Sequence, residues 1–309
     1  MASKGGEKRD WATYNKALIT RGSLTVWIDR EALAQWFAPE DPCHIGRPHV
    51  YSDLAIQFIL TLREAYGLTL RAAQGFVESI FELMGVTLKV PHFTTFGRRA
   101  ATVPIDLGAS TADGPRVILL DSTGLKVFGE GEWKVRKHGY SKRRTWRKLH
   151  LAIDADSREI VAAVTTTNAE SDASAVDEML DEIDGEVGEL KADGAYDQRG
   201  VYETLKRRKI KPVIPPRRNA KIIKHGNASG PREARDENLR VIRKNGRKRW
   251  KKESGYHERS LAETAMFRVK TLTGEKLRHR KLETQETESR IKCRVINRMT
   301  RLGLLVSKT

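Results

Sequence analysis

Apolar residues at helical spacing dominate the first third of the chain. They predict helices over residues 51–66 and 69–84, with Gly67 between them, and a further helix after Pro91. Two helices joined across a glycine suggest a helix-turn-helix. Arg98 and Arg99 of the next helix would then lie near phosphates if this region binds DNA. An ordinary helical bundle accounts for the same pattern equally well.

From residue 117 onward the pattern changes to short apolar or alternating runs, which are typical of strands. The predicted strands are residues 117–121, 148–154, 159–166, 188–193 and 211–215, and the predicted helices are residues 172–183, 200–208 and 286–302. Three strands followed by alternating helices and strands are the order of a ribonuclease H-like α/β core with a mixed five-stranded sheet. We therefore expect a helical domain at residues 1–110 and this core at residues 111–309.

Two aspartates lie at the ends of predicted strands. Asp121 ends the first apolar run, and a buried strand of this kind delivers its carboxylate to the edge of a sheet. Asp193 ends the fourth. Asp154 and Asp156 flank a predicted turn, where side-chain hydrogen bonding favours aspartate, so we interpret them as turn residues. Asp197 is expected to be a cap or turn residue, and support of Asp193 is the alternative.

The composition indicates a folded protein with a polyanionic partner. Hydrophobic residues make up 39% of the 309 residues, and the net charge is +17. Nucleic acid and an acidic membrane surface both fit that charge. No run of about 18 apolar residues occurs, so we expect no membrane association and a cytoplasmic location. Cys43 and Cys293 lack metal-ligand spacing and are predicted to be reduced and structural.

Positive charge is concentrated in two segments. Residues 217–252 contain fourteen Lys or Arg against three acids, and their glycines and proline suggest a loop or hairpin insertion, at about residues 217–255. Trp250 lies among these cations and is predicted to stack on an unpaired base. The second run, residues 134–148, includes Arg143 and Arg144. Charge runs are often only solvated surfaces, but two of them beside candidate carboxylates favour nucleic-acid binding.

Residues 256–270 are predicted to form one helix with a polar face. At about 100° per residue, Tyr256, Arg259 and Lys270 fall within about 40° of Glu263. The apolar residues of the opposite face are expected to pack on the sheet; they are Leu261, Ala262, Ala265, Val269 and Leu272. Arg259 and Glu263 alone are also explained by a weak surface pair at i and i+4.

The Tyr-x2-Arg-x3-Glu-x6-Lys spacing of this segment resembles the signature of insertion-sequence DDE transposases. The resemblance extends to Asp121 in Leu-Asp-Ser-Thr-Gly, to Asp193 in Ala-Asp-Gly-Ala-Tyr-Asp, and to residues 14–24. It is strongest to the group named after insertion sequence five, whose members carry an N-terminal DNA-binding part ahead of a ribonuclease H-like catalytic core.

The resemblance implies an active site and a reaction. Asp121, Asp193 and Glu263 would be the catalytic triad and would bind two Mg²⁺ ions, for which Mn²⁺ can substitute. The reaction would be endonucleolytic strand cleavage followed by strand transfer. Arg259 and Lys270 would contact phosphates, and Tyr256 would pack on the sugar-phosphate backbone.

The partners that the resemblance implies are double-stranded DNA, as terminal inverted repeats and as target, and a second copy of the chain on paired ends. The location would be the bacterial nucleoid. Two alternatives remain open: a ribonuclease H-like nuclease without strand transfer, and a non-catalytic DNA-binding repressor. His150, on a strand, is more simply explained as a core histidine than as a catalytic one.

Overall fold

The computed structural model describes residues 11–40, 46, 48–109, 113–127, 146–223 and 233–304. Its sheet, among these residues, has six strands. The strands are β1 (Arg116–Val127), β2 (Trp146–Asp154), β3 (Ile160–Thr167), β4 (Val187–Lys191), β5 (Lys211–Val213) and β6 (Lys276–Leu277). The order is β3-β2-β1-β4-β5, with β6 paired to β1. β2 is antiparallel to both of its neighbours, β1 and β3, whereas β4 and β5 run parallel to β1. This arrangement is consistent with a ribonuclease H-like core.

β1 is longer than the sequence pattern predicts. It continues past Asp121 to Val127 and stays paired with β2 as far as Lys126 and Trp146. Gly124 permits this because a side chain there would come within 3.2 Å of the Trp146 ring. The prediction that the strand ends at Asp121 was therefore wrong: Asp121 lies within β1. The prediction of five strands also missed β6, which has only two residues.

Helices dominate the described residues up to residue 100. The helices are α1 (Trp11–Thr20), α2 (Leu24–Trp27), α3 (Arg30–Ala34), α4 (Asp53–Ala65), α5 (Leu70–Leu83) and α6 (Phe93–Arg99). Ser52 and Thr69 cap α4 and α5, because each hydroxyl accepts a hydrogen bond from the backbone N–H three residues later. Between them Gly67 has φ +66°, a conformation that glycine adopts without strain. The helix pair around this glycine was predicted from the sequence, and it is present.

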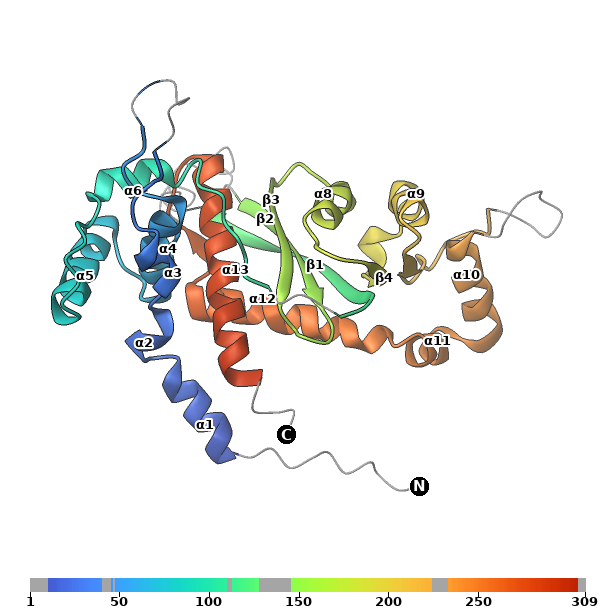
Figure 1. Ribbon diagram of the computed structural model, residues 1–309. Helices are drawn as coiled ribbons and strands as arrows, with labels where there is room; N and C mark the ends of the chain where they lie inside the picture. The colour runs from blue at the N-terminus through green and yellow to red at the C-terminus, as the bar shows by residue number, and fades with distance from the viewer. Residues whose placement is uncertain are drawn as a thin grey trace, which may run out of the picture.

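Helices cover both faces of the sheet (Figure 1). One face packs against α8 (Val176–Asp181) and α9 (Arg199–Arg207), and the other against α12 (Ser260–Thr273) and α13 (Leu282–Leu304). Short 3-10 helices precede α8 and α12, as η2 (Asp172–Ala175) and η4 (Tyr256–Arg259), and η3 (Gly194–Tyr196) follows β4. α13 lies between the sheet and α4. The apolar core on this side continues from the sheet into the N-terminal helices.

From residue 234 onward the basic insertion is mainly helical, whereas residues 217–223 contain turns and no helix. It forms α10 (Ala234–Asn245) and α11 (Arg247–Glu253), separated by Gly246 at φ +82°. The prediction of a loop or hairpin here was wrong for these residues. The glycine does break the chain direction, but the polar residues on either side of it continue as helix. Figure 1 shows the two helices at the end of the molecule opposite α5.

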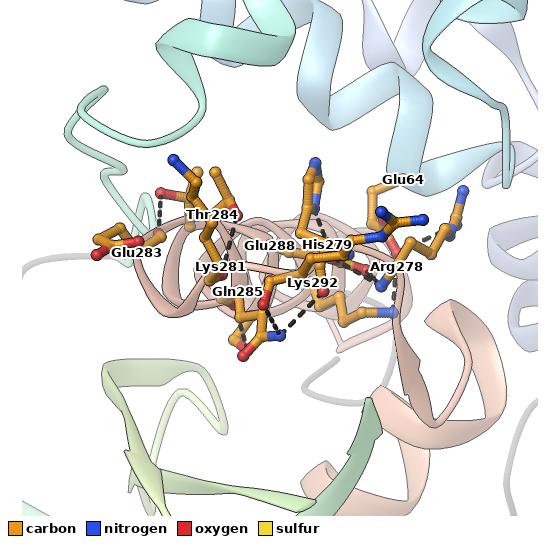
Figure 2. Close-up of polar contacts among 12 residues, drawn as sticks. Glu64, Arg278, His279, Lys281, Glu283, Thr284, Gln285, Glu288 and Lys292 are labelled. Atoms are coloured by element: carbon orange, nitrogen blue, oxygen red, sulfur yellow. Dashed lines mark hydrogen bonds and ion pairs between the residues drawn. The ribbon is translucent and has the colours of Figure 1, made fainter. Parts of the chain in front are cut away.

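A buried ionic network joins the N-terminal helices to the sheet side of the molecule (Figure 2). Lys292 of α13 forms an ion pair with Glu64 of α4 at 2.8 Å, and both side chains are buried. Arg278 lies 3.4 Å from Glu64. Glu288, also on α13, accepts hydrogen bonds from the backbone N–H groups of Arg278 and His279 and contacts the His279 ring. Lys292 and Glu288, two charged residues that α13 buries, are therefore matched by α4 and by the segment after β6.

Two sequence predictions on other residues can be compared directly. Cys293 is buried and free; Cys43 lies outside the described residues. No helix in the described part of the chain is both long enough and apolar enough to cross a membrane.

Candidate active site

Asp121 and Asp193 are brought together by the register of two parallel strands. Leu119 of β1 pairs with Lys191 of β4, and each aspartate lies two residues beyond its strand's member of this pair. Neighbouring strands are about 4.8 Å apart, and residues two apart point to the same face. The two carboxylates therefore stand on the same face of the sheet. The hydrogen-bonded ladder between β1 and β4 ends at Leu119 and Lys191, so the aspartates follow where pairing stops.

Each aspartate is oriented by a backbone donor. Asp121 accepts a hydrogen bond from the N–H of Ser122, at 2.9 Å. Asp193 caps η3, where its carboxylate accepts from the N–H of Ala195 at 2.8 Å. These short-range bonds fix the side-chain directions without using all of the carboxylate oxygens.

Glu263 approaches the same place from α12, and Arg259 links it to β1. One nitrogen of the Arg259 guanidinium donates to Asp121 Oδ2 at 3.0 Å, and another donates to Glu263 Oε1. The predicted i and i+4 pair is therefore present, but it extends to an acid 138 residues earlier in the chain. One guanidinium thus bridges a carboxylate of β1 and a carboxylate of α12.

The electrostatics of Asp121 reflect first its burial and then the charged groups beside it. Burial raises the pKa of Asp121, and the charges of Asp193 and Glu263 raise it further, while the Ser122 N–H and Arg259 oppose the shift. A cation close to this carboxylate would stabilise its charged form. Three hard oxygen-donor groups of this kind match the ligand preference of divalent cations such as Mg²⁺. Within the described ranges, however, no group of three or more His, Cys, Asp or Glu side chains is close enough together to hold a metal ion.

Tyr256 and Lys270, predicted on the same helix face as Glu263, occupy different surroundings. Tyr256 is 9% exposed and packs against Trp250, with ring centroids 5.9 Å apart, while Arg259 lies over its ring. It belongs to η4, because the first turn of the predicted helix is a 3-10 helix. Lys270 is half-buried near the other end of α12. Of the predicted packing face, Ala262, Ala265 and Val269 are buried, but Leu272 is exposed.

Trp250 does not present its ring to solvent. The indole is 3% exposed, packs with Val213 and Tyr256, and donates its N–H to Asn238 at 3.2 Å. A ring so enclosed holds the insertion against the core and does not form a surface on which a base stacks. The prediction of an exposed stacking residue at this position was therefore wrong in its geometry.

The arginines predicted to bind DNA are placed unequally. Arg98 is exposed at the end of α6. Arg99 is largely buried, forms an ion pair with Asp53, and donates to the carbonyl of Tyr51. It therefore fastens α6 to the start of α4. Arg143 and Arg144 lie outside the described residues.

The remaining polar residues of the sequence analysis have structural partners. Asp154 accepts from the N–H groups of Asp156 and Ser157, as a turn residue does, and pairs with Arg116. His150 is buried and shares a hydrogen bond with Thr166. Burial lowers the pKa of His150, so it stays neutral in the core.

Asp197 has a partner that sequence patterns did not reveal. Its buried carboxylate pairs with Arg235 of α10 at 2.7 Å and accepts from the N–H of Arg217 at 2.9 Å. It fastens the basic insertion to the segment that carries Asp193. Arg235 was one of fourteen cations in its segment, and nothing in the local sequence distinguishes it from the solvated ones.

Comparison with protein-family models identifies the family of the chain. A family model described as a transposase DDE domain matches residues 112–298, which is more than half of the chain. A second model with the same description matches residues 19–130. The chain belongs to the DDE transposase family. Membership implies a nuclease or transposase activity on DNA, and members typically use divalent metal ions. In this DDE transposase the two matches together span the helices α2 to α6 and the sheet.

Proposed function

We propose that this DDE transposase binds the terminal inverted repeats of an insertion sequence and catalyses divalent-metal-dependent strand cleavage and strand transfer. We assign it to the group named after insertion sequence five. The observation that carries the proposal is the link from Arg259 to both Asp121 and Glu263, with Asp193 beside Asp121 in the strand register. Three acids that are far apart in the sequence thereby form an acidic site on a protein whose net charge is +17.

Asp121, Asp193 and Glu263 are proposed to be the catalytic triad. Their oxygens would hold Mg²⁺, with Mn²⁺ as a substitute. When bound, two such ions polarise the attacking water or 3′-hydroxyl and stabilise the leaving oxygen of a phosphoryl displacement. Because Arg259 now lies between Asp121 and Glu263, ligation by both acids requires its guanidinium to turn away from at least one of them.

Arg259, once released, is suited to a phosphate oxygen. Its planar fork makes two parallel hydrogen bonds, whereas Lys270 would act on a phosphate as a point charge. Tyr256 lies beneath the Arg259 guanidinium and keeps it near the acids, and we propose that its ring edge packs on the sugar-phosphate backbone.

The DNA is proposed to run across the basic surfaces outside the triad. We propose that residues 1–110 form the end-binding domain, with exposed Arg98 as a phosphate contact, and that residues 111–309 form the catalytic domain. The insertion at about residues 217–255 would hold the duplex near the site. On its helix α11, Lys248 is exposed and Lys251 is partly exposed. Arg143 and Arg144 remain proposed contacts.

The proposed assembly is a homodimer on paired element ends, which would operate at the bacterial nucleoid in the cytoplasm. The net charge of +17 supports a polyanionic partner. Phosphate contacts release condensed counterions, so binding to the ends is expected to weaken steeply as salt rises.

Substitutions in the triad test the function. Asp121→Asn, Asp193→Asn and Glu263→Gln are each expected to abolish cleavage of end-bearing DNA, because an amide binds a divalent cation far less well than a carboxylate. End-binding in a gel-shift assay should stay close to wild type. Full cleavage by any one variant removes that residue from the triad. Cleavage without joined products on supplied target DNA identifies a nuclease, and binding without any metal-dependent product identifies a repressor.

A further inference from the structure

Lys191 is a buried cation that the proposed chemistry does not use. It lies on β4 with its side chain 5% exposed, on the same face of the sheet as Asp193 two residues later. A lysine buried to this degree is rare unless it is paired, because its charge has been taken out of water. The partners of Lys191 therefore indicate its structural role.

The partners of Lys191 come from two different elements. Glu189, on the same strand, lies 3.1 Å from its Nζ. Glu258 of η4 lies 2.7 Å from Nζ, and the carbonyl of Gly255 accepts a hydrogen bond from it at 3.2 Å. The Lys191 ammonium thus links β4 to η4, the 3-10 helix that precedes α12 and Glu263.

Gly255 shows how close that approach is. A Cβ at this position would come 2.9 Å from Lys191 Nζ, and the backbone has φ +65°. A residue with a side chain would meet both a steric and a conformational cost there. The chain is therefore built to bring the start of η4 directly against the Lys191 ammonium.

The two sides that Lys191 joins are the two sides of the acidic site. Asp193 follows Lys191 by two residues, just beyond the end of β4; on η4, Glu258 immediately precedes Arg259, and Glu263 follows within α12. We propose that Lys191 is a positioning residue, which fixes the helix carrying Glu263 relative to the end of β4 and the Asp193 that follows it. This inference rests on the proposed function, in that it assigns the spacing a role in metal ligation and strand cleavage.

The ion pairs around Glu189 supply a matched control. Lys211 of β5 also pairs with Glu189, at 2.6 Å, but its side chain is 69% exposed and, among the described residues, it forms no hydrogen bond or ion pair with η4. Removing Lys211 takes a cation from the same carboxylate without touching the Glu263 helix. For Glu258, the control is Glu203 on α9, which pairs with Arg199 on an exposed surface.

The test compares Lys191→Met and Glu258→Gln with Lys211→Met and Glu203→Gln. Three quantities are measured for each: the single-turnover cleavage rate on end-bearing DNA, the affinity for that DNA, and Mn²⁺ binding by calorimetry. Outer-sphere support of metal ligands is typically worth about 10–100-fold in metal affinity or activity. We therefore expect Lys191→Met and Glu258→Gln to lose about tenfold or more in cleavage rate and in Mn²⁺ affinity. DNA affinity should change less than twofold, and both controls should match wild type.

The two substitutions are also expected to be non-additive. Once Glu258→Gln has removed the contact on the helix side, adding Lys191→Met should cost less than it does alone. Cleavage and Mn²⁺ affinity within twofold of wild type in either single variant would overturn the proposal, as would an equal loss in Lys211→Met. If Lys191→Met does not fold, Glu258→Gln decides alone, because Glu258 is half-exposed and its loss leaves the core intact.

Failure of the proposed function gives a different result. A wild-type chain that binds Mn²⁺ but makes no DNA product would refute the transposase function. The calorimetric comparison of the four variants would still report whether Lys191 positions the acids.

Discussion

The buried ion pair between Lys292 and Glu64 predicts a large and specific stability effect. The two side chains are 0% and 1% exposed, and their charged atoms are 2.8 Å apart. Lys292 Nζ also donates to the carbonyls of Thr273 and Gly274, at 2.5 and 3.2 Å, where α12 ends. Lys292→Met keeps most of the side-chain volume but leaves a buried carboxylate and two carbonyls without this donor.

The magnitude follows from the geometry. At an effective dielectric constant of about 20, opposite charges at 2.8 Å attract by about 6 kcal/mol, most of which offsets the cost of burying them. Removing one partner of such a pair typically costs about 3–5 kcal/mol. Arg278, 3.4 Å from Glu64, is the remaining ion-pair partner among the described residues, so we expect a loss of about 3 kcal/mol.

Urea unfolding at neutral pH measures the effect, and two further variants sharpen it. Glu64→Gln/Lys292→Met should be more stable than Lys292→Met, because the stranded charge is gone. Lys126→Met breaks a more exposed pair with Glu275 and should cost less than about 1 kcal/mol. A loss below about 1 kcal/mol in Lys292→Met, or a double variant that shows the simple sum of the single losses, would refute the reasoning.

Three further predictions concern other buried groups. The pKa of Glu288 is lowered: burial acts to raise it, but hydrogen bonds from His279 and from the Arg278 N–H outweigh burial. A lowered folded-state pKa contributes stability that is present above pH 4.5 and is lost as pH falls, so the stability gap between wild type and Glu288→Gln should narrow on acidification in urea titrations. A gap that widens contradicts this. Trp250→Ala should cost about 3 kcal/mol in the same assay; a negligible cost together with weakened single-strand binding would restore the stacking hypothesis. Burial raises the pKa of Cys293 to about 12. In a Cys43→Ser background the native thiol should therefore react with a disulfide reagent at pH 8 far more slowly than the unfolded chain, and equal rates would show that it is accessible.

The sequence was sufficient to predict the helices and strands in which apolar residues recur at a regular spacing. The helices at α4 and α5 and the strands β2, β3 and β5 appear within a few residues of their predicted bounds because burial of one face imposes the period. β1 was cut short at Asp121 because Ser122, Thr123 and Gly124 look like a turn. Pairing with β2, which lies elsewhere in the sequence, keeps them extended. The helices α10 and α11 were missed because they carry few apolar residues and show little periodicity.

In the candidate site, too, contacts within one helix could be predicted from the sequence, whereas contacts between distant segments could not. The Arg259–Glu263 contact follows from helical spacing alone, whereas its extension to Asp121 depends on how β1 and α12 pack. Lys191 had no signal beyond being a charged residue in a predicted strand. Trp250 was misassigned because neighbouring cations are visible in the sequence, and the cavity that its ring fills is not.

The most direct test of the proposed active site is incubation of the purified protein with DNA carrying its own element ends, with and without Mg²⁺ or Mn²⁺, followed by mapping of the cut positions at nucleotide resolution. We expect cuts at the element ends that require the cation, leave 3′-hydroxyl groups and lead to joined products when target DNA is added. End-specific binding with no cation-dependent cut under any of these conditions would contradict this expectation.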